Sequence, residues 1–374
     1  MSSSNARKAR VLIVDDSVVA RRLLAEVLGD DPDIEVVGTA ASGAIALGKL
    51  QLVRPDVIVL DVEMPEMTGL ELLPLIRKAQ PDARIIMYSS LTARGAAATL
   101  DALALGASDY VTKPANTTGL NESRLRIKNE LSSKIKALYR LSVSQTIEIP
   151  VTLSARPSLR ATSSGGGRID IVAIGASTGG PNALVDVLTA IDPGFPVPIA
   201  VVQHMPPVFT RLLAERIASR NGGRAVEVED GARLRAGHIY VAPGDHHLSV
   251  ERDTVSLVAR VRQTPPENYC RPAVDVLFRS VAATVGAHGL AVMLTGMGHD
   301  GFRGCQDLKA AGGTIFAQDK ATSVVWGMPG MVVNAGIADE ILPLAHIGPR
   351  LCARTAGQRT GRSASLPRWE GHAG

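Results

Sequence analysis

Residues 171 to 181, IVAIGASTGGP, place a glycine cluster directly after a run of apolar, largely β-branched residues. The apolar run is typical of a buried strand, and GPNALVDVLTAI after it has the spacing of an amphipathic helix. A strand, a glycine-rich turn and a helix in this order indicate an α/β domain. The turn also contains Gly-x-Ser-x-Gly, so Ser177 is either a nucleophile raised on a tight turn or part of an ordinary connection.

The alternation of strand and helix patterns continues through the second half of the chain. Further strands are expected at VPIAVVQH, HIYVAP, TVSLVARV, GLAVMLTG and TIFAQD, and helices at VFTRLLAERIASR, AVDVLFRSVAATVG and DGFRGCQDLKAAG. This pattern predicts a mostly parallel, Rossmann-like sheet with helices on both faces. An antiparallel hairpin is expected near residues 238 to 261.

Three polar residues follow strands of this predicted sheet, namely Ser177, His204 and Asp300. Parallel strands end at one edge of a sheet, so a hydroxyl, an imidazole and a carboxylate are expected to meet there. A serine hydroxyl is a weak nucleophile that needs a base, and the base needs an orienting acid. The glycine-rich turn TGMGHDG at 295 to 301 offers backbone N–H groups for an oxyanion. These residues favour a hydrolase without a cofactor in its active site.

Several alternatives remain open from these residues alone. GASTGG can also form a phosphate cradle, although it lacks the Lys-Ser/Thr of a P-loop and the spacing of Gly-x-Gly-x-x-Gly. His299 is a rival base, and Cys270 a rival nucleophile that no neighbour in sequence activates. His246 and His247 resemble a metal pair, but adjacent strand residues point to opposite faces, so a solvated turn is expected.

The first half of the chain predicts a second doubly wound parallel sheet. Apolar strands at VLIV, IEVVG, DVIVL, RIIMYSS and DYVTK alternate with helical segments. One such segment is SVVARRLLAEVLG, in which Val19, Leu23 and Val27 recur every four residues. Polar residues end four of these strands: Asp15, Asp16, Asp61, Ser89 and Lys113. Converging carboxylates repel one another unless a cation lies among them, and carboxylates with open positions suit Mg²⁺.

Composition excludes several other classes of protein. The 374 residues carry a net charge of +4 and only 3% aromatic residues, which argues against a nucleic-acid-binding surface. No basic recognition helix follows a turn in the second half, so a DNA-binding output is also disfavoured. Three widely spaced cysteines, a polar N-terminus and no long apolar run indicate a cytoplasmic protein that is not inserted in a membrane.

The segments VDDS, LDVEMPEMTG, YSSL and VTKP resemble the receiver domain of two-component response regulators. The resemblance implies that a histidine kinase phosphorylates Asp61. It also implies Mg²⁺ bound by Asp16, Asp61 and the backbone carbonyl of Glu63, with Asp15 in the acidic pocket. Ser89 and Lys113 would contact the phosphoryl group, and Tyr110 matches the family's aromatic switch position.

Six blocks of the second half, in order, resemble the catalytic domain of chemotaxis protein-glutamate methylesterases, the CheB family. The blocks are IGASTGGP, QHMPPVFT, YVAPGDHHL, RPAVDVLFRSV, LTGMGHDG and VVWGMPG. The resemblance implies a Ser177 nucleophile, a His204 base, an orienting Asp300 and an oxyanion donor at the Met297 N–H. It further implies hydrolysis of glutamate γ-methyl esters on the cytoplasmic domains of chemoreceptors, with possible deamidation of glutamines.

The two resemblances predict four parts along the chain. A receiver domain is expected at 1–120, a linker at 121–166, a methylesterase domain at 167–350 and a disordered tail at 351–374. We expect the unphosphorylated receiver to pack over the Ser177 cleft, and phosphorylation of Asp61 to weaken that packing.

Overall fold

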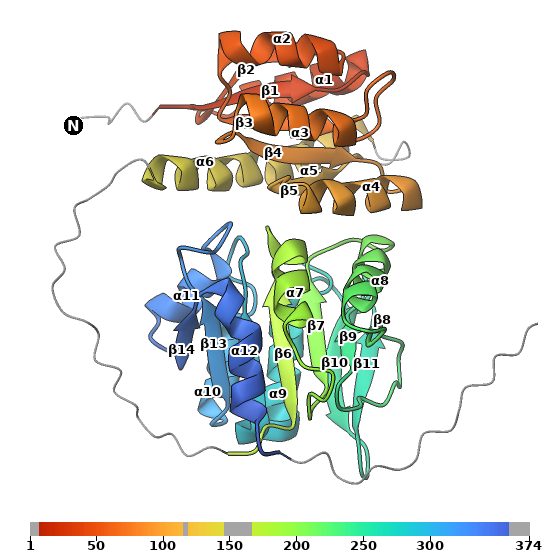
Figure 1. The fold of residues 1–374 in the computed structure, drawn as a ribbon, viewed down its shortest axis with the longest axis vertical. Helices are drawn as coiled ribbons and strands as arrows, with labels where there is room; N and C mark the ends of the chain where they lie inside the picture. The colour runs from red at the N-terminus through yellow and green to blue at the C-terminus, as the bar shows by residue number, and fades with distance from the viewer. Residues whose placement is uncertain (1–6, 115–118, 146–166, 359–374) are drawn as a thin grey trace, which may run out of the picture.

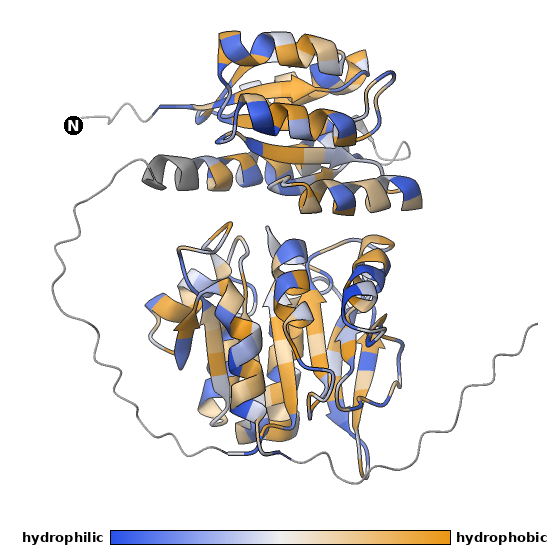
Figure 2. Cartoon of the chain, viewed as in Figure 1, coloured by the Kyte–Doolittle hydropathy of each residue, from blue (hydrophilic) through white to orange (hydrophobic). Residues whose placement is uncertain are grey.

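The computed structural model describes residues 7–114, 119–145 and 167–358, which form two α/β domains, one above the other in Figure 1. Each domain has a parallel sheet between layers of helices, so the predicted fold class is confirmed. The strands of both sheets are almost continuously hydrophobic (Figure 2), as expected for parallel sheets that are covered on both faces. No helix among the described residues is both long and apolar enough to cross a membrane.

The first domain contains a five-stranded sheet of order β2-β1-β3-β4-β5. Its strands are β1 (Ala9–Val14), β2 (Ile34–Ala40), β3 (Val57–Asp61), β4 (Arg84–Ser89) and β5 (Asp109–Thr112). Its helices begin with α1 (Val18–Gly29), α2 (Gly43–Val53), α3 (Gly69–Ala79) and α4 (Ala93–Ala104). In α1, Leu24, Val27 and Leu28 are buried, whereas Val19 is 73% exposed. The buried stripe therefore begins one turn later than the sequence pattern predicts.

A helical extension completes the first domain beyond the boundary expected at residue 120. Helix α5 (Leu120–Ile127), the π-helical turn η1 (Lys128–Ser132) and α6 (Ser133–Gln145) are continuous. They bury Ile127, Leu131, Ile135 and Leu138 against β-strand residues of this domain. The expectation of a linker from 121 is therefore wrong for this stretch, because its apolar residues recur at helical spacing. The rest of the expected linker, 146–166, lies outside the described residues.

The second domain contains a seven-stranded sheet of order β14-β13-β12-β6-β7-β9-β8. Its strands are β6 (Ile171–Ala176), β7 (Ile199–Gln203), β8 (Ala225–Glu227), β9 (Ile239–Val241), β12 (Gly289–Met293), β13 (Thr314–Gln318) and β14 (Glu340–Leu342). Its helices are α7 (Gly180–Thr189), α8 (Phe209–Arg220), α9 (Val274–Val285), η2 (Gly286–His288), α10 (Phe302–Ala310), α11 (Met328–Asn334) and α12 (Leu344–Thr355).

Two expectations for the second domain need correction. The antiparallel hairpin is β10 (His247–Arg252) with β11 (Leu257–Arg262), whereas the strand at 239–241 joins the main sheet in parallel with β7. The tail expected from residue 351 begins later, because α12 continues to Thr355 and buries Leu351. Residues 359–374 lie outside the described chain.

The strand order creates a topological switch point in each sheet. Strand β6 lies between β7 and β12: the chain runs from β6 to β7 and on toward one edge, and later returns to β12 on the other side of β6. In the first sheet β1 lies in the same way between β2 and β3. Ligand sites of open α/β sheets lie beyond the carboxyl ends of the strands at such points. The fold therefore predicts sites after Ala176 and after Val14.

The first domain covers the carboxyl edge of the second sheet (Figure 1). Tyr110, just inside β5, stacks on Phe209 at the start of α8, with ring centroids 4.9 Å apart and planes 8° apart. The amide of Asn182 on α7 donates to the Leu103 carbonyl of α4 over 2.7 Å. Arg216 on α8 pairs with Asp101 over 3.2 Å. These contacts fix the β5–α4 face of the first domain against α7 and α8.

We predict that Leu131→Ala destabilises the first domain by about 2–4 kcal/mol, because Leu131 is fully buried in the helical extension. Leu125→Ala is the matched control, since Leu125 is 60% exposed, and its effect should stay within about 0.5 kcal/mol. Urea unfolding of both variants measures the difference. Equal effects would show that the extension does not belong to the folded unit.

Candidate active site

Ser177 and His204 leave the sheet side by side. Ala176 pairs with Gln203 in the β6–β7 register, so the next residue of each strand is the hydroxyl and the imidazole, respectively. The backbone N–H of His204 donates to the Ala176 carbonyl over 3.2 Å, and the Gln203 amide donates to the Ser177 carbonyl over 2.9 Å. Neighbouring strands are about 4.8 Å apart. The two candidate catalytic residues are therefore brought together by the sheet itself.

The turn that carries Ser177 needs glycine at two positions where neighbouring side chains leave no room for a Cβ. The backbone N–H of Ser177 donates to the Thr295 carbonyl over 3.0 Å. This hydrogen bond holds the 295–301 loop against the turn. A Cβ on Gly296 would lie 2.9 Å from the Ser177 Cβ, closer than side chains pack. On the other side, a Cβ on Gly180 would collide with the Gln203 amide. These glycines let two loops and a strand end meet around one half-buried hydroxyl.

His204 is joined to Asp300 by a hydrogen bond of 2.7 Å between Nε2 and Oδ2. Burial disfavours a charged ring, but this bond and a contact with Cys270 outweigh it and raise the pKa of His204 to about 10. The carboxylate therefore fixes the ring and stabilises its protonated form. Since Nε2 is occupied, Nδ1 is the nitrogen that remains to exchange a proton with a substrate or nucleophile.

Asp300 is held at the N-terminus of α9. Its carboxylate accepts hydrogen bonds from the N–H groups of Val274 (2.6 Å) and Asp275 (3.1 Å), the first residues of that helix. The Gly301 N–H donates to it over 2.9 Å. Burial alone would raise its pKa, but the hydrogen bond from His204 and these backbone donors keep the pKa of Asp300 below its ordinary value. A helix N-terminus stabilises an anion in this way.

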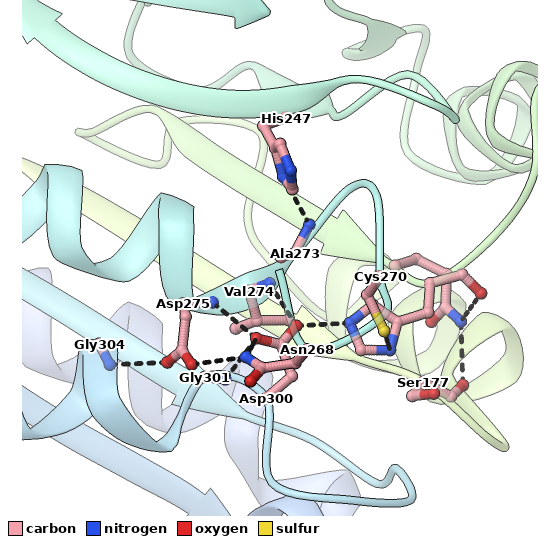
Figure 3. A network of polar contacts seen from close by, with 12 residues as sticks. Ser177, His247, Asn268, Cys270, Ala273, Val274, Asp275, Asp300, Gly301 and Gly304 are labelled. Atoms are coloured by element: carbon pink, nitrogen blue, oxygen red, sulfur yellow. Dashed lines mark hydrogen bonds and ion pairs between the residues drawn. The ribbon is translucent and has the colours of Figure 1, made fainter. Parts of the chain in front are cut away.

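A second buried carboxylate, which the sequence patterns did not single out, supports Asp300 (Figure 3). The Asn268 amide donates 2.8 Å bonds both to Asp300 and to Asp275. Asp275 is fully buried and also accepts from the Gly304 N–H over 2.7 Å. Burial raises the pKa of Asp275. Asn268 lies on a loop and has a left-handed backbone conformation, with a φ of +52°. A sequence pattern for a strand or helix therefore cannot predict that it bridges two acids.

Cys270 lies closer to the candidate site than its place in the sequence indicates. Its Sγ is 3.6 Å from Nδ1 of His204, while the other ring nitrogen is bonded to Asp300. In the view of Figure 3, Cys270 and Ser177 lie on the same side of Asp300. No sequence neighbour of Cys270 is involved in this contact, because the imidazole comes from a strand end 66 residues away.

The other histidines of this region do not enter the site. His299 is exposed and makes no side-chain hydrogen bond to Ser177 or Asp300 within the described chain. His247, expected in a solvated turn, is only 2% exposed. Its Nε2 contacts the Pro265 carbonyl at 3.0 Å, and its Nδ1 accepts from the Ala273 N–H at 3.1 Å. That expectation is wrong, since His247 anchors the loop that carries Asn268 and Cys270.

A second cluster lies at the carboxyl edge of the first sheet. Lys113 Nζ is 2.7 Å from Asp61 Oδ2 and 3.2 Å from Asp15 Oδ2, and both acids are buried. Burial and the charge of Asp15 raise the pKa of Asp61 to about 6, against the opposing effect of Lys113. Oxygens of Asp15, Asp16 and Asp61 all lie within 4.8 Å of one another. This crowded, electron-rich donor set fits a hard divalent cation such as Mg²⁺.

Three further residues are predicted for this cluster, namely Glu63, Ser89 and Tyr110, and they differ in which groups they contact. Glu63 donates its backbone N–H to Asp61 over 3.2 Å. The Ser89 hydroxyl faces α4 instead, accepting from Thr99 at 2.6 Å and donating to the Gly95 carbonyl at 3.1 Å. Tyr110 is 4% exposed and points to the second domain, where it stacks on Phe209. Ser89 thus faces α4 and Tyr110 faces the second domain, and both α4 and Tyr110 lie at the interface between the domains.

Comparison with known proteins gives matches over both domains. Residues 172–351 match the family model of the CheB methylesterase, and residues 11–123 match that of the response regulator receiver domain. A protein-glutamate methylesterase/protein-glutamine glutaminase of a Nocardioides species is 49% identical over 360 residues, covering 94% of this chain and 96% of the relative.

Two further matches are a second curated relative and a solved structure. A protein of the same name from Trichodesmium erythraeum is 47% identical over 348 residues, which cover 93% of this chain and 99% of the relative. The crystal structure of the Thermotoga maritima CheB methylesterase catalytic domain is 41% identical with a TM-score of 0.49, covering 50% of this chain and 99% of that one.

We predict that the stability of the protein declines from about pH 6.5 to pH 10 through His204. Its pKa rises from 6.5 in the unfolded chain to about 10 in the folded one, so the folded state holds the extra proton in this range. The resulting stabilisation is complete below pH 6.5 and lost as the pH approaches 10. Urea unfolding at pH 6, 8 and 10 should show a decline that is smaller in His204→Gln by more than about 1 kcal/mol. Parallel curves for the two proteins would contradict the assignment.

Proposed function

The chain belongs to the family of protein-glutamate methylesterases/protein-glutamine glutaminases, and we propose that it hydrolyses glutamate γ-methyl esters on the cytoplasmic domains of chemoreceptors. Deamidation of receptor glutamines would use the same site. The observation that carries the proposal is the His204–Asp300 hydrogen bond at the point where Ser177 and His204 leave adjacent strands. A substrate that is itself a protein surface requires a site at the rim of a domain, which is where these residues lie.

The proposed reaction follows the positions of the groups. The reaction requires the neutral form of the His204 ring, which its raised pKa makes the minor form near neutral pH. In that form Nδ1 accepts the proton of Ser177 Oγ as the oxygen attacks the ester carbonyl, and Asp300 stabilises the imidazolium that forms. The tetrahedral oxyanion is assigned to the backbone N–H of Met297, in the loop that touches Ser177. His204 returns the proton to the leaving methanol. Water, activated by the same nitrogen, then releases the glutamate from Ser177.

A receiver domain of this family implies Mg²⁺-dependent phosphorylation with a histidine kinase as donor. In our proposal Asp61 accepts the phosphoryl group, and Asp16, Asp61 and the Glu63 carbonyl hold the cation. Mg²⁺ would neutralise charge on the phosphoryl oxygens. Lys113 already contacts Asp61. Ser89 would leave Gly95 and Thr99 to contact the phosphoryl group, which changes the packing of α4.

We propose that this change activates the esterase by loosening the contact between the domains. Helix α4 and Tyr110 form the receiver side of the interface, and Phe209 follows His204 by five residues. Val325 is buried with the receiver helices, and Met297 and Val324 pack against the same cluster. The unphosphorylated receiver therefore packs against both loops that flank Ser177. A substrate helix would need that space.

We expect Ser177→Ala to abolish methanol release from methylated receptor fragments, because the nucleophile is lost. Labelling by a serine-directed phosphonate should disappear with it, whereas phosphorylation of Asp61 should be unchanged. A response regulator with a nucleotide-binding output would neither react with the phosphonate nor release methanol. Full methanol release by the variant would overturn the assigned nucleophile.

A charge swap tests the role of the interface. Arg216→Asp should raise the esterase rate of the unphosphorylated protein a few-fold, since an ion pair with one exposed partner contributes up to about 1 kcal/mol. Asp101→Arg in the same chain should restore the low rate. The rate is measured with and without a small phosphodonor, and Asp61→Asn should not respond to the donor.

The isolated residues 167–358 provide the upper limit of the rate. If they are no faster than the unphosphorylated whole chain, the receiver does not restrain the esterase. The esterase assignment itself would survive that result.

A further inference from the structure

The thiol of Cys270 lies beside Nδ1 of His204, the ring nitrogen that has to accept the proton of Ser177 in the proposed reaction. With Nε2 of His204 bonded to Asp300, the sulfur lies 3.6 Å from the remaining nitrogen. We propose that Cys270 is a modification site, at which hydrogen peroxide or a soft electrophile reacts with the thiol, and that the modified sulfur blocks Nδ1 of His204 and switches the esterase off. The inference rests on the proposed esterase activity for its functional consequence, but the thiol chemistry can be measured separately.

The thiol is held in place by the structure around it. Cys270 and Glu267 exchange backbone hydrogen bonds of 2.9 and 3.1 Å, which close a tight turn. Glu267 pairs with Arg279 of α9 over 2.8 Å, and Asn268 is bonded to Asp300 and Asp275. On the other side Arg271 pairs with Asp245. The loop therefore presents the sulfur to the ring by contacts that do not involve the thiol.

The surroundings also allow a small reagent to reach the sulfur. Cys270 is half-buried, and its neighbour Tyr269 is fully exposed. Reactivity of a cysteine depends on access and on a nearby base or cation that favours the thiolate. The His204 imidazole is such a group, and the contact with the sulfur contributes to the raised pKa of the ring.

The other two thiols lack this combination and serve as internal controls. Cys305 is fully buried, and burial raises its pKa well above the ordinary value. Cys352 on α12 is half-buried, and burial raises its pKa as well. Neither has a histidine partner among the described residues. The charge of Asp192 also raises the pKa of Cys352, so the part of a rate difference that is due to His204 is the part that His204→Gln removes.

The oxidation is chemically balanced with peroxide as the oxidant. The neutral His204 ring takes the thiol proton on Nδ1, and the sulfur attacks one oxygen of hydrogen peroxide. The O–O bond breaks, the sulfur loses two electrons to become a sulfenic acid, and the leaving hydroxide takes the proton from Nδ1 and departs as water. A dithiol restores the thiol through a mixed disulfide, with release of water and formation of the cyclic disulfide of the reductant. In the oxidised state the added oxygen lies next to Nδ1, where the Ser177 proton must arrive.

The reactivity is tested on the full-length chain with iodoacetamide and mass spectrometry of the three cysteine peptides. Cys270 should be alkylated about tenfold faster than Cys352, and His204→Gln should remove most of that advantage. Ser177→Ala should leave it unchanged, which separates this result from the fate of the esterase proposal. Equal rates for Cys270 and Cys352 in the native protein would overturn the inference.

The consequence is tested with hydrogen peroxide and the esterase assay. Activity of the wild type should fall in proportion to oxidation of Cys270 and return with dithiothreitol. Cys270→Ala should hydrolyse the ester and resist peroxide, and Cys352→Ala should be as sensitive as the wild type. Peroxide sensitivity in Cys270→Ala, or full activity of wild type with Cys270 oxidised, would contradict the inference. Cys270→Ser, which keeps a small polar side chain at the position, provides the same test if the alanine variant does not fold.

Discussion

The site depends on how a buried carboxylate is kept ionised. Asp300 lies in the interior of the second domain, where an uncompensated charge is strongly unfavourable. The N-terminus of α9, the Gly301 N–H and the Asn268 amide compensate it. Because three of these donors are backbone N–H groups, the carboxylate can orient His204 without shifting itself. The position of α9 relative to β12 thus determines the geometry of the imidazole that serves Ser177.

The same structural principle serves both domains. In each, side chains from separate strands meet at the carboxyl edge of a parallel sheet beside its switch point. In the first domain the edge collects acids and Lys113, a set suited to a cation and a phosphoryl group. In the second it collects a hydroxyl and an imidazole in register. The receiver packs on this second edge through Tyr110 and α4. A shift of α4 or Tyr110 at the first edge therefore directly alters the packing over the second edge.

The sequence predicts the strand-end residues well, because a parallel sheet brings its strand ends together whatever the loops do. Asp15, Asp61, Lys113, Ser177 and His204 are all of this kind. Residues on long loops behave differently. Asn268 and Cys270 reach the site through a loop with left-handed residues, and His247 of β10 anchors that loop. Each of these three residues contacts a partner more than 20 residues away. The sequence shows some helical periodicity at 115–138, but its charged residues obscure the stripe of four apolar ones that packs on the first sheet.

In the proposed mechanism Ser177, and not the nearby thiol, forms the covalent bond with the substrate. The most direct test is acid quenching of the full-length protein during turnover of a methylated receptor peptide, followed by mapping of the trapped acyl group by mass spectrometry. The account predicts a glutamyl ester on the peptide that contains Ser177. A glutamyl thioester on the peptide that contains Cys270 would contradict it, and would assign the imidazole of His204 to the sulfur as its catalytic partner.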